Sequence, residues 1–149
     1  MTIKYYWEDF SPGQVREGGS VTLSEEEIIE FASKYDPQPF HVDRELAKQS
    51  VFGGLIASGW HTASIYMRML CDLYLLETAG LGSPGIDELR WVKPVRPGDT
   101  LRGRAEVLGV RPSSKGGRGF VNFKCEIFRG DDKVLSFTTW PIFATRGND

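Results

Sequence analysis

The sequence predicts an α+β fold in which a long central helix is wrapped by a curved antiparallel β-sheet. Residues 59–78 are apolar on nearly every side of a helix, so other parts of the chain must surround them. The C-terminal half instead alternates apolar and polar residues, as in LRGRAEV (101–107) and FVNFKCEIF (120–128). Such alternation is typical of antiparallel strands with one solvated face. One buried helix followed by a run of strands indicates that the sheet curls around the helix.

Length and composition predict one domain that spans residues 1–149. Of the 149 residues, 40% are hydrophobic and 26% charged, and the net charge of -2 lacks the basic footprint of a nucleic-acid-binding protein. The start MTIKYYWEDF has no secretion-signal pattern, and the most apolar stretch, residues 60–76, contains Arg68 and Asp72. We therefore expect a cytoplasmic protein with no membrane span and no nucleic-acid partner.

Cysteine and histidine usage argues against a disulfide framework and a metal site. Cys71 and Cys125 fit neither a C-x-x-C pair nor a zinc pattern. The chain has two histidines, His41 and His61, and their separation of 20 positions offers no metal-ligand spacing. We expect no metal, and we expect His61 to pack or cap within its helix.

The first helix is marked at both ends by local sequence signals. Residues 20–23 could form a short strand, and Ser24 with Glu27 then makes a capping box. Residues before proline avoid the helical region, so Asp36, which precedes Pro37, should end this helix.

Two further helices are expected before the strands. Pro39 should keep the residues after it extended, and Asp43 should cap a short helix that runs to about Ser50. Ser58 is a suitable N-cap for the long helix over residues 59–78. Strands are then predicted over residues 86–95, 101–107, 120–128 and 133–140.

The segment FASKYDPQPFHVDRE (31–45) carries the candidate chemistry. Asp36 and His41 lie five positions apart, and Pro37 and Pro39 restrict the backbone between them. Histidine titrates near neutrality and can donate or accept a proton, and a neighbouring carboxylate can share that work. The segment is therefore either an ordinary helix exit or an acid–base pair held in a rigid loop.

Three stretches carry a family resemblance: YDPQPFHVD, FGGLIASGWHTAS and LRWVKPVRPGDTL. Together they resemble the MaoC-like dehydratases and (R)-specific enoyl-CoA hydratases, which have the hotdog fold. The resemblance extends over most of the chain. The aspartate–histidine segment with the small-residue loop after it is fairly specific, whereas the KPVRPGDTL stretch marks the fold alone.

The resemblance implies roles for individual residues of this chain. Asp36 and His41 would hold a water molecule against the β-carbon of a thioester, and the Gly59 amide at the start of the central helix would bind the thioester oxygen. Two positions depart from the pattern. Family members commonly have asparagine where Gln38 stands, and often histidine where Ser58 stands. These departures bear on the substrate rather than on the acid and base.

The predicted function is that of a lyase: a hydratase or dehydratase that adds or removes water across a 2-enoyl or 3-hydroxyacyl thioester of coenzyme A. Ser58, Phe40 and Trp60 are counted with the substrate-binding residues, and Phe40, Trp60 and Trp91 are expected to influence pocket depth. No cofactor besides the coenzyme A of the substrate is implied. A sheet edge left unpaired predicts a homodimer. The alternatives are a hotdog thioesterase and a non-catalytic acyl-CoA-binding module.

Overall fold

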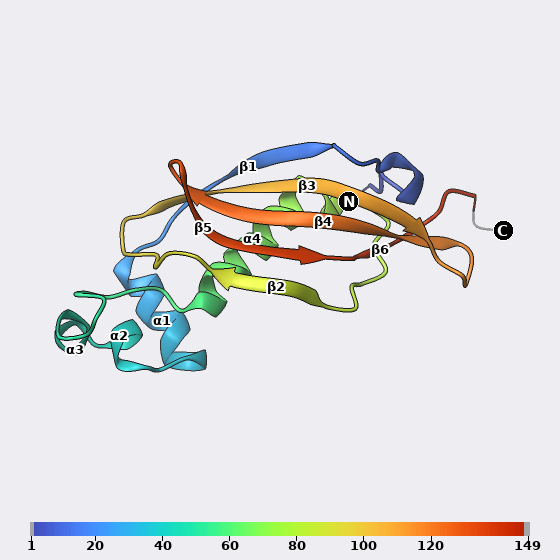
Figure 1. Ribbon diagram of the computed structural model, residues 1–149. Coiled ribbons are helices and arrows are strands. Elements are labelled where there is room, and N and C mark those ends of the chain that lie inside the picture. The colour runs from blue at the N-terminus through green and yellow to red at the C-terminus, as the bar shows by residue number, and fades with distance from the viewer. Residues whose placement is uncertain (1, 148–149) are drawn as a thin grey trace.

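The computed structural model describes residues 2–147 and shows one antiparallel sheet with the long helix α4 against one of its faces (Figure 1). Along the sheet the strands follow the order β1-β3-β4-β5-β2, and β6 pairs with β4 beside this path. The strands are β1 (Val15–Thr22), β2 (Ile86–Trp91), β3 (Thr100–Pro112), β4 (Arg118–Arg129), β5 (Asp132–Thr139) and β6 (Ile142–Ala144). The predicted α+β architecture is confirmed.

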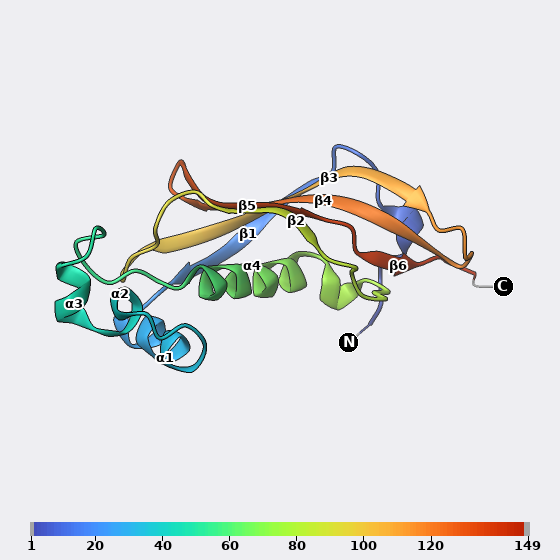
Figure 2. The same cartoon turned by 60° about the horizontal axis from the view of Figure 1, so that its bottom comes forward.

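The sheet is curved, and α4 (Gly59–Leu73) runs along its concave side (Figure 2). The core lies between the two layers, where Tyr66, Met69 and Leu70 of α4 meet the inward side chains of the strands. In β4 these inward residues include Val121 and Phe123, which are fully buried. Burial of such large apolar side chains contributes roughly 1.5–3 kcal/mol each and holds the helix on the sheet.

The helix α1 (Glu25–Tyr35) begins and ends where its sequence predicts. Ser24 Oγ accepts from the Glu27 amide at 3.1 Å, and the Glu27 carboxylate accepts from the Ser24 amide at 3.2 Å. Asp36 is the C-cap, and its amide donates to the Ala32 carbonyl. The helix therefore ends at the residue before Pro37, where the pyrrolidine ring disfavours another helical turn.

The residues after Pro39 are not extended as predicted but form the short helix α2 (Pro39–Val42). Pro39 occupies the first position of this helix, where proline's missing N–H costs nothing and its fixed φ favours the turn. Asp43 then caps α3 (Arg44–Lys48), and its carboxylate accepts from two amides at 3.0 Å. In Figure 2 these small helices project with α1 beyond the end of the sheet.

The long helix is shorter than predicted. It ends at Leu73 instead of residue 78, and a 3-10 turn (Leu75–Glu77) follows it. Tyr74 leaves the helical conformation because its ring is buried against Phe10 and Phe123, with centroids 5.5 Å and 5.2 Å away. Tertiary packing thus overrides the apolar pattern.

The helix is also not surrounded on every side. Trp60 and Met67 on α4 are 55% and 45% exposed, and Ile86 and Trp91 on the edge strand β2 are 43% and 46% exposed. The indoles of Trp60 and Trp91 meet where the start of α4 lies beside the end of β2, with ring centroids 5.3 Å apart. Within residues 2–147, no helix has the length and apolar character needed to cross a membrane.

Candidate active site

The candidate site is built where the C-terminal end of α1 meets the N-terminal end of α4. Asp36 ends α1, His41 lies on α2, and Ser58 is the N-cap of α4. A cap or a proline sets each position along the chain, and the contact between α1 and α4 brings the three together. Three of the predicted site residues therefore converge.

The carboxylate of Asp36 is the centre of this hydrogen-bond cluster. Its Oδ2 accepts from Ser58 Oγ at 2.7 Å and lies 3.3 Å from His41 Nε2. Its Oδ1 accepts from Gln38 Nε2 at 2.7 Å. Both positions at which the sequence departs from the family pattern, Gln38 and Ser58, thus touch this carboxylate directly.

Two opposing effects set the charge state of Asp36. Partial burial by itself raises the pKa of a carboxyl group, because it disfavours the ionised form. Hydrogen bonds from Gln38 and Ser58, together with the nearby His41, outweigh burial and lower the pKa of Asp36 below its usual value. The group is therefore ionised at neutral pH although only 16% of its side chain is exposed.

The imidazole of His41 is buried, with 4% of the residue exposed, and its orientation is fixed from both sides. Nδ1 lies 2.7 Å from the carbonyl oxygen of Ile56, which can only accept, so Nδ1 carries a proton. In the neutral ring this leaves the Nε2 lone pair turned toward Asp36. The Phe40 ring packs edge-on against His41, with centroids 4.6 Å apart. The Ile56 carbonyl is a backbone group and has no signature in the sequence.

Gly59, the first residue of α4, faces a different part of the site. It lines a cavity of about 240 Å³ between the start of α4 and the loop after β2. The walls are mainly apolar and come from Phe52, Ile56, Ala57, Thr62, Trp91, Val92, Lys93, Pro94, Val95 and Val134. Asp36 and His41 do not line this cavity. The hydrogen-bond cluster and the cavity adjoin through the consecutive residues Ser58 and Gly59.

The Gly59 amide is a free donor at the helix N-terminus. No acceptor within residues 2–147 takes a hydrogen bond from it, whereas the next amide, that of Trp60, donates to Ser58 Oγ at 3.3 Å. The first amides of a helix have no partner within the helix, and the helix dipole adds a partial positive charge there. The group can therefore stabilise a negative charge that develops in the cavity.

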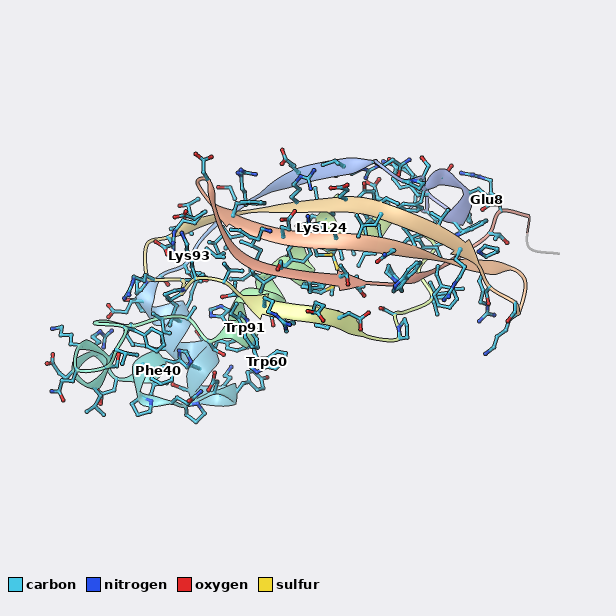
Figure 3. The ribbon with its side chains drawn as sticks, in the orientation of Figure 1. Glu8, Phe40, Trp60, Trp91, Lys93 and Lys124 are labelled. Carbon is cyan, nitrogen blue, oxygen red and sulfur yellow. The ribbon has the colours of Figure 1, made fainter. Side chains whose placement is uncertain are left out.

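The remaining predicted residues lie at the edges of the site. Trp60 is 55% exposed and contacts Trp91, with ring centroids 5.3 Å apart, instead of lining the cavity. Figure 3 shows the two indoles next to each other and Phe40 farther along the projecting helices. His61 packs parallel to the Phe31 ring, 4.6 Å away at 8° between the ring planes, as the packing interpretation predicted.

A larger hollow of about 470 Å³ lies at the opposite end of α4, near Tyr74 and Arg16. Arg16 donates to the Leu73 carbonyl, and its guanidinium lies over the rings of Tyr5 and Tyr74. A cation that caps the C-terminal end of a helix in this way has a structural role. The size of a cavity alone therefore does not identify the active site. The smaller cavity next to Asp36 and His41 is the better candidate for the substrate-binding pocket.

Comparison with known proteins assigns the family. The model of the MaoC like domain matches residues 9–123. The chain belongs to the MaoC-like family. An (R)-specific enoyl-CoA hydratase of Rhodospirillum rubrum is 32% identical over 124 residues, which are 82% of this chain and 80% of that protein.

One solved structure supports the same family assignment, and a second one supports the fold. A MaoC-like dehydratase from Rhodospirillum rubrum superposes with a TM-score of 0.89 at 36% identity, covering 96% of this chain and 99% of that one. A conserved hypothetical protein of Mycobacterium tuberculosis with a double hotdog fold superposes with a TM-score of 0.79 at 23% identity, covering 97% of this chain and 46% of that one. The predicted hotdog fold is confirmed.

Proposed function

We propose that this MaoC-like chain is a hydro-lyase that interconverts 2-enoyl and 3-hydroxyacyl thioesters of coenzyme A. The observation that carries the proposal is the pair of Asp36 Oδ2 and the buried His41 Nε2, 3.3 Å apart beside the start of α4. Family membership and the enoyl-CoA hydratase among the relatives give the reaction class additional support.

Asp36 and the neutral form of His41 present two acceptors to a water molecule. An ionised carboxylate and the lone pair of a neutral imidazole cannot hydrogen-bond to each other without a proton between them. A water that donates one O–H to Asp36 and the other to His41 satisfies both groups. Its own lone pair is then free to attack an electrophilic carbon, and either acceptor can take the released proton.

Hydration needs no redox step. The water oxygen forms a bond to the β-carbon, the carbon–carbon double bond opens, and negative charge moves to the thioester oxygen as an enolate. The Gly59 amide would donate to that oxygen, and such a donor is worth roughly 3–4 kcal/mol in the transition state. A proton from the Asp36–His41 pair then reaches the α-carbon, so that the sum is the addition of one water. Dehydration is the reverse sequence.

The test is the loss of enoyl absorbance when the protein is mixed with crotonyl-CoA and with longer or branched 2-enoyl-CoAs. Asp36→Asn and His41→Ala should each slow turnover by about 10²–10⁴-fold, the usual contribution of a positioned acid or base. Asp72→Asn is the matched control, because Asp72 lies on the exposed side of α4 in an ion pair with Arg68. No turnover with a broad panel, or unchanged rates in both variants, would refute the proposal. Release of free thiol would instead identify a thioesterase, and tight binding without turnover a binding module.

We also propose that the chain acts as a homodimer. In the isolated chain β2 is an edge strand, with an unpaired row of backbone groups along its outer side. Ile86 on that strand is a large apolar side chain that is 43% exposed. Pairing of two β2 edges would cover both features and would bring the cavities close to the interface.

A further inference from the structure

The indole of Trp91 occupies the space in which Gly59 would carry a side chain. A Cβ built on Gly59 would lie 2.3 Å from both Cε2 and Nε1 of the Trp91 ring. No real side chain could fit at that distance, so the ring rests directly on the Gly59 backbone. Both residues also line the 240 Å³ cavity. Trp91 is therefore the wall of the cavity that directly contacts the backbone of Gly59.

Trp91 is held mainly through its backbone. It is the last residue of the edge strand β2, where it pairs with Leu135 of β5. Its ring contacts Trp60 in a T-shaped arrangement, and within residues 2–147 the indole N–H has no acceptor. With 46% of the residue exposed, the ring borders the cavity on one side and solvent on the other (Figure 3).

We propose that Trp91 determines specificity next to the thioester carbonyl: its indole selects acyl groups that have no substituent on the α-carbon. The inference rests on the proposed function, in which the thioester oxygen binds at the Gly59 amide. The α-carbon is bonded to the carbonyl carbon, so a thioester bound in this way has its α-carbon close to whatever covers Gly59. In this chain that group is a rigid, bulky ring rather than open space.

The expected size of the effect follows from how apolar walls discriminate. One methyl group more or less in an apolar pocket changes kcat/KM by about 10–200-fold. The wild type should therefore prefer crotonyl-CoA over 2-methylcrotonyl-CoA by at least about 10-fold. Trp91→Ala should reduce this ratio by about 10-fold or more, and Trp91→Phe, with its smaller ring, should give an intermediate ratio.

A control is available in another tryptophan. Trp140 directly follows β5, next to Thr139, which pairs with Ile86 at the other end of β2 from Trp91, and it does not line the cavity. Trp140→Ala should leave the ratio of the two substrates unchanged. If Trp91→Ala leaves that ratio unchanged, or if Trp140→Ala alters it as strongly, the inference is wrong. Trp91→Phe and Trp91→Leu keep the test valid if the alanine variant does not fold.

Binding of saturated thioesters separates this inference from the proposed reaction. Butyryl-CoA and 2-methylbutyryl-CoA differ by one α-methyl group, and neither can take up or lose water. Calorimetry should show tighter binding of butyryl-CoA to the wild type and a smaller difference for Trp91→Ala. That result in a protein that hydrates no enoyl thioester would leave the inference standing while the lyase proposal fails. Equal binding of the two compounds to the wild type, or binding of neither, would overturn the inference even if hydration is observed.

Discussion

The hydroxyl of Ser58 donates to Oδ2 of Asp36 at 2.7 Å, so the residue that begins α4 also fixes the carboxylate that ends α1. One side chain thereby links the helix N-terminus, where the free Gly59 amide lies, to the carboxylate beside His41. The relative placement of the proposed acid–base pair and the proposed oxyanion donor depends on this bond. Its removal should therefore alter both the chemistry and its dependence on pH.

The first prediction concerns the pH profile. Hydrogen bonds from Gln38 and Ser58 help lower the pKa of Asp36, so loss of either donor should move that pKa upward. Because the ionised carboxylate is the active form, the acid limb of kcat/KM against pH should move to higher pH in Gln38→Leu and Ser58→Ala. Ser64→Ala is the control, since Ser64 bonds to the Trp60 carbonyl on the exposed side of α4. An acid limb that stays in place in both variants would show that Asp36 does not set it.

The second prediction separates two reasons for the glycine at position 59. A Cβ at Gly59 clashes with the Trp91 ring, so Gly59→Ala should lower thermal stability. Adding Trp91→Ala removes the ring, and the double variant should recover much of the lost stability, which a double-mutant cycle of melting temperatures can measure. Recovery of stability without recovery of turnover would mean that the substrate itself also needs the space. If stability does not recover, the clash with Trp91 is not the cause.

The third prediction uses the second histidine. Burial lowers the pKa of His61, and the charge of Glu27 only partly offsets this effect. The unfolded chain therefore binds a proton near pH 6.5 more readily than the folded chain does, so stability should fall as pH drops through that value. Within residues 2–147 the buried Nδ1 atom of His61 has no hydrogen-bond partner, and the ring stacks on Phe31, so His61→Phe should remove this part of the pH dependence at little cost.

Urea unfolding at about pH 7.5 and about pH 5.5 checks this expectation, because the two values bracket the usual pKa of histidine. The wild type should lose more stability than His61→Phe between the two conditions. The opposite order, or equal losses, would show that His61 is not the group responsible. His41, the other histidine of the chain, remains in both proteins and serves as an internal reference.

The fourth prediction tests the proposed dimer. Ile86→Lys places a charge on the exposed edge strand β2 and should shift the mass measured by sedimentation from dimer toward monomer. Leu108→Lys is a closely matched control, because Leu108 is 42% exposed compared with 43% for Ile86 but lies on β3 inside the sheet. A wild type that sediments as a monomer, or equal effects of the two lysines, would argue against pairing through β2.

Much of the site could be predicted because its framework is local. The N-caps at Ser24, Asp43 and Ser58 and the helix end at Asp36 depend on a few neighbouring residues, and all lie where the sequence indicates. The proximity of Asp36 and His41 also follows from a short, proline-restricted segment.

Features that depend on distant contacts were not predictable in the same way. The helix end at Leu73 is set by aromatic packing of Tyr74 on other elements, and the orientation of His41 is set by the backbone carbonyl of Ile56. The family resemblance points only to the amide of Gly59. The structure shows in addition that Trp91, from a different element, already rests on it. Spacing along the chain carries no information about such a contact.

The Asp36–Ser58 bond joins the end of α1 to the start of α4, whereas Trp91 comes from the sheet. Proton transfer and acyl selection would accordingly be encoded in two separable stretches of the gene. Exchange of the residue at the end of β2 could then redirect the protein to new acyl groups while the water-activating arrangement stays as it is.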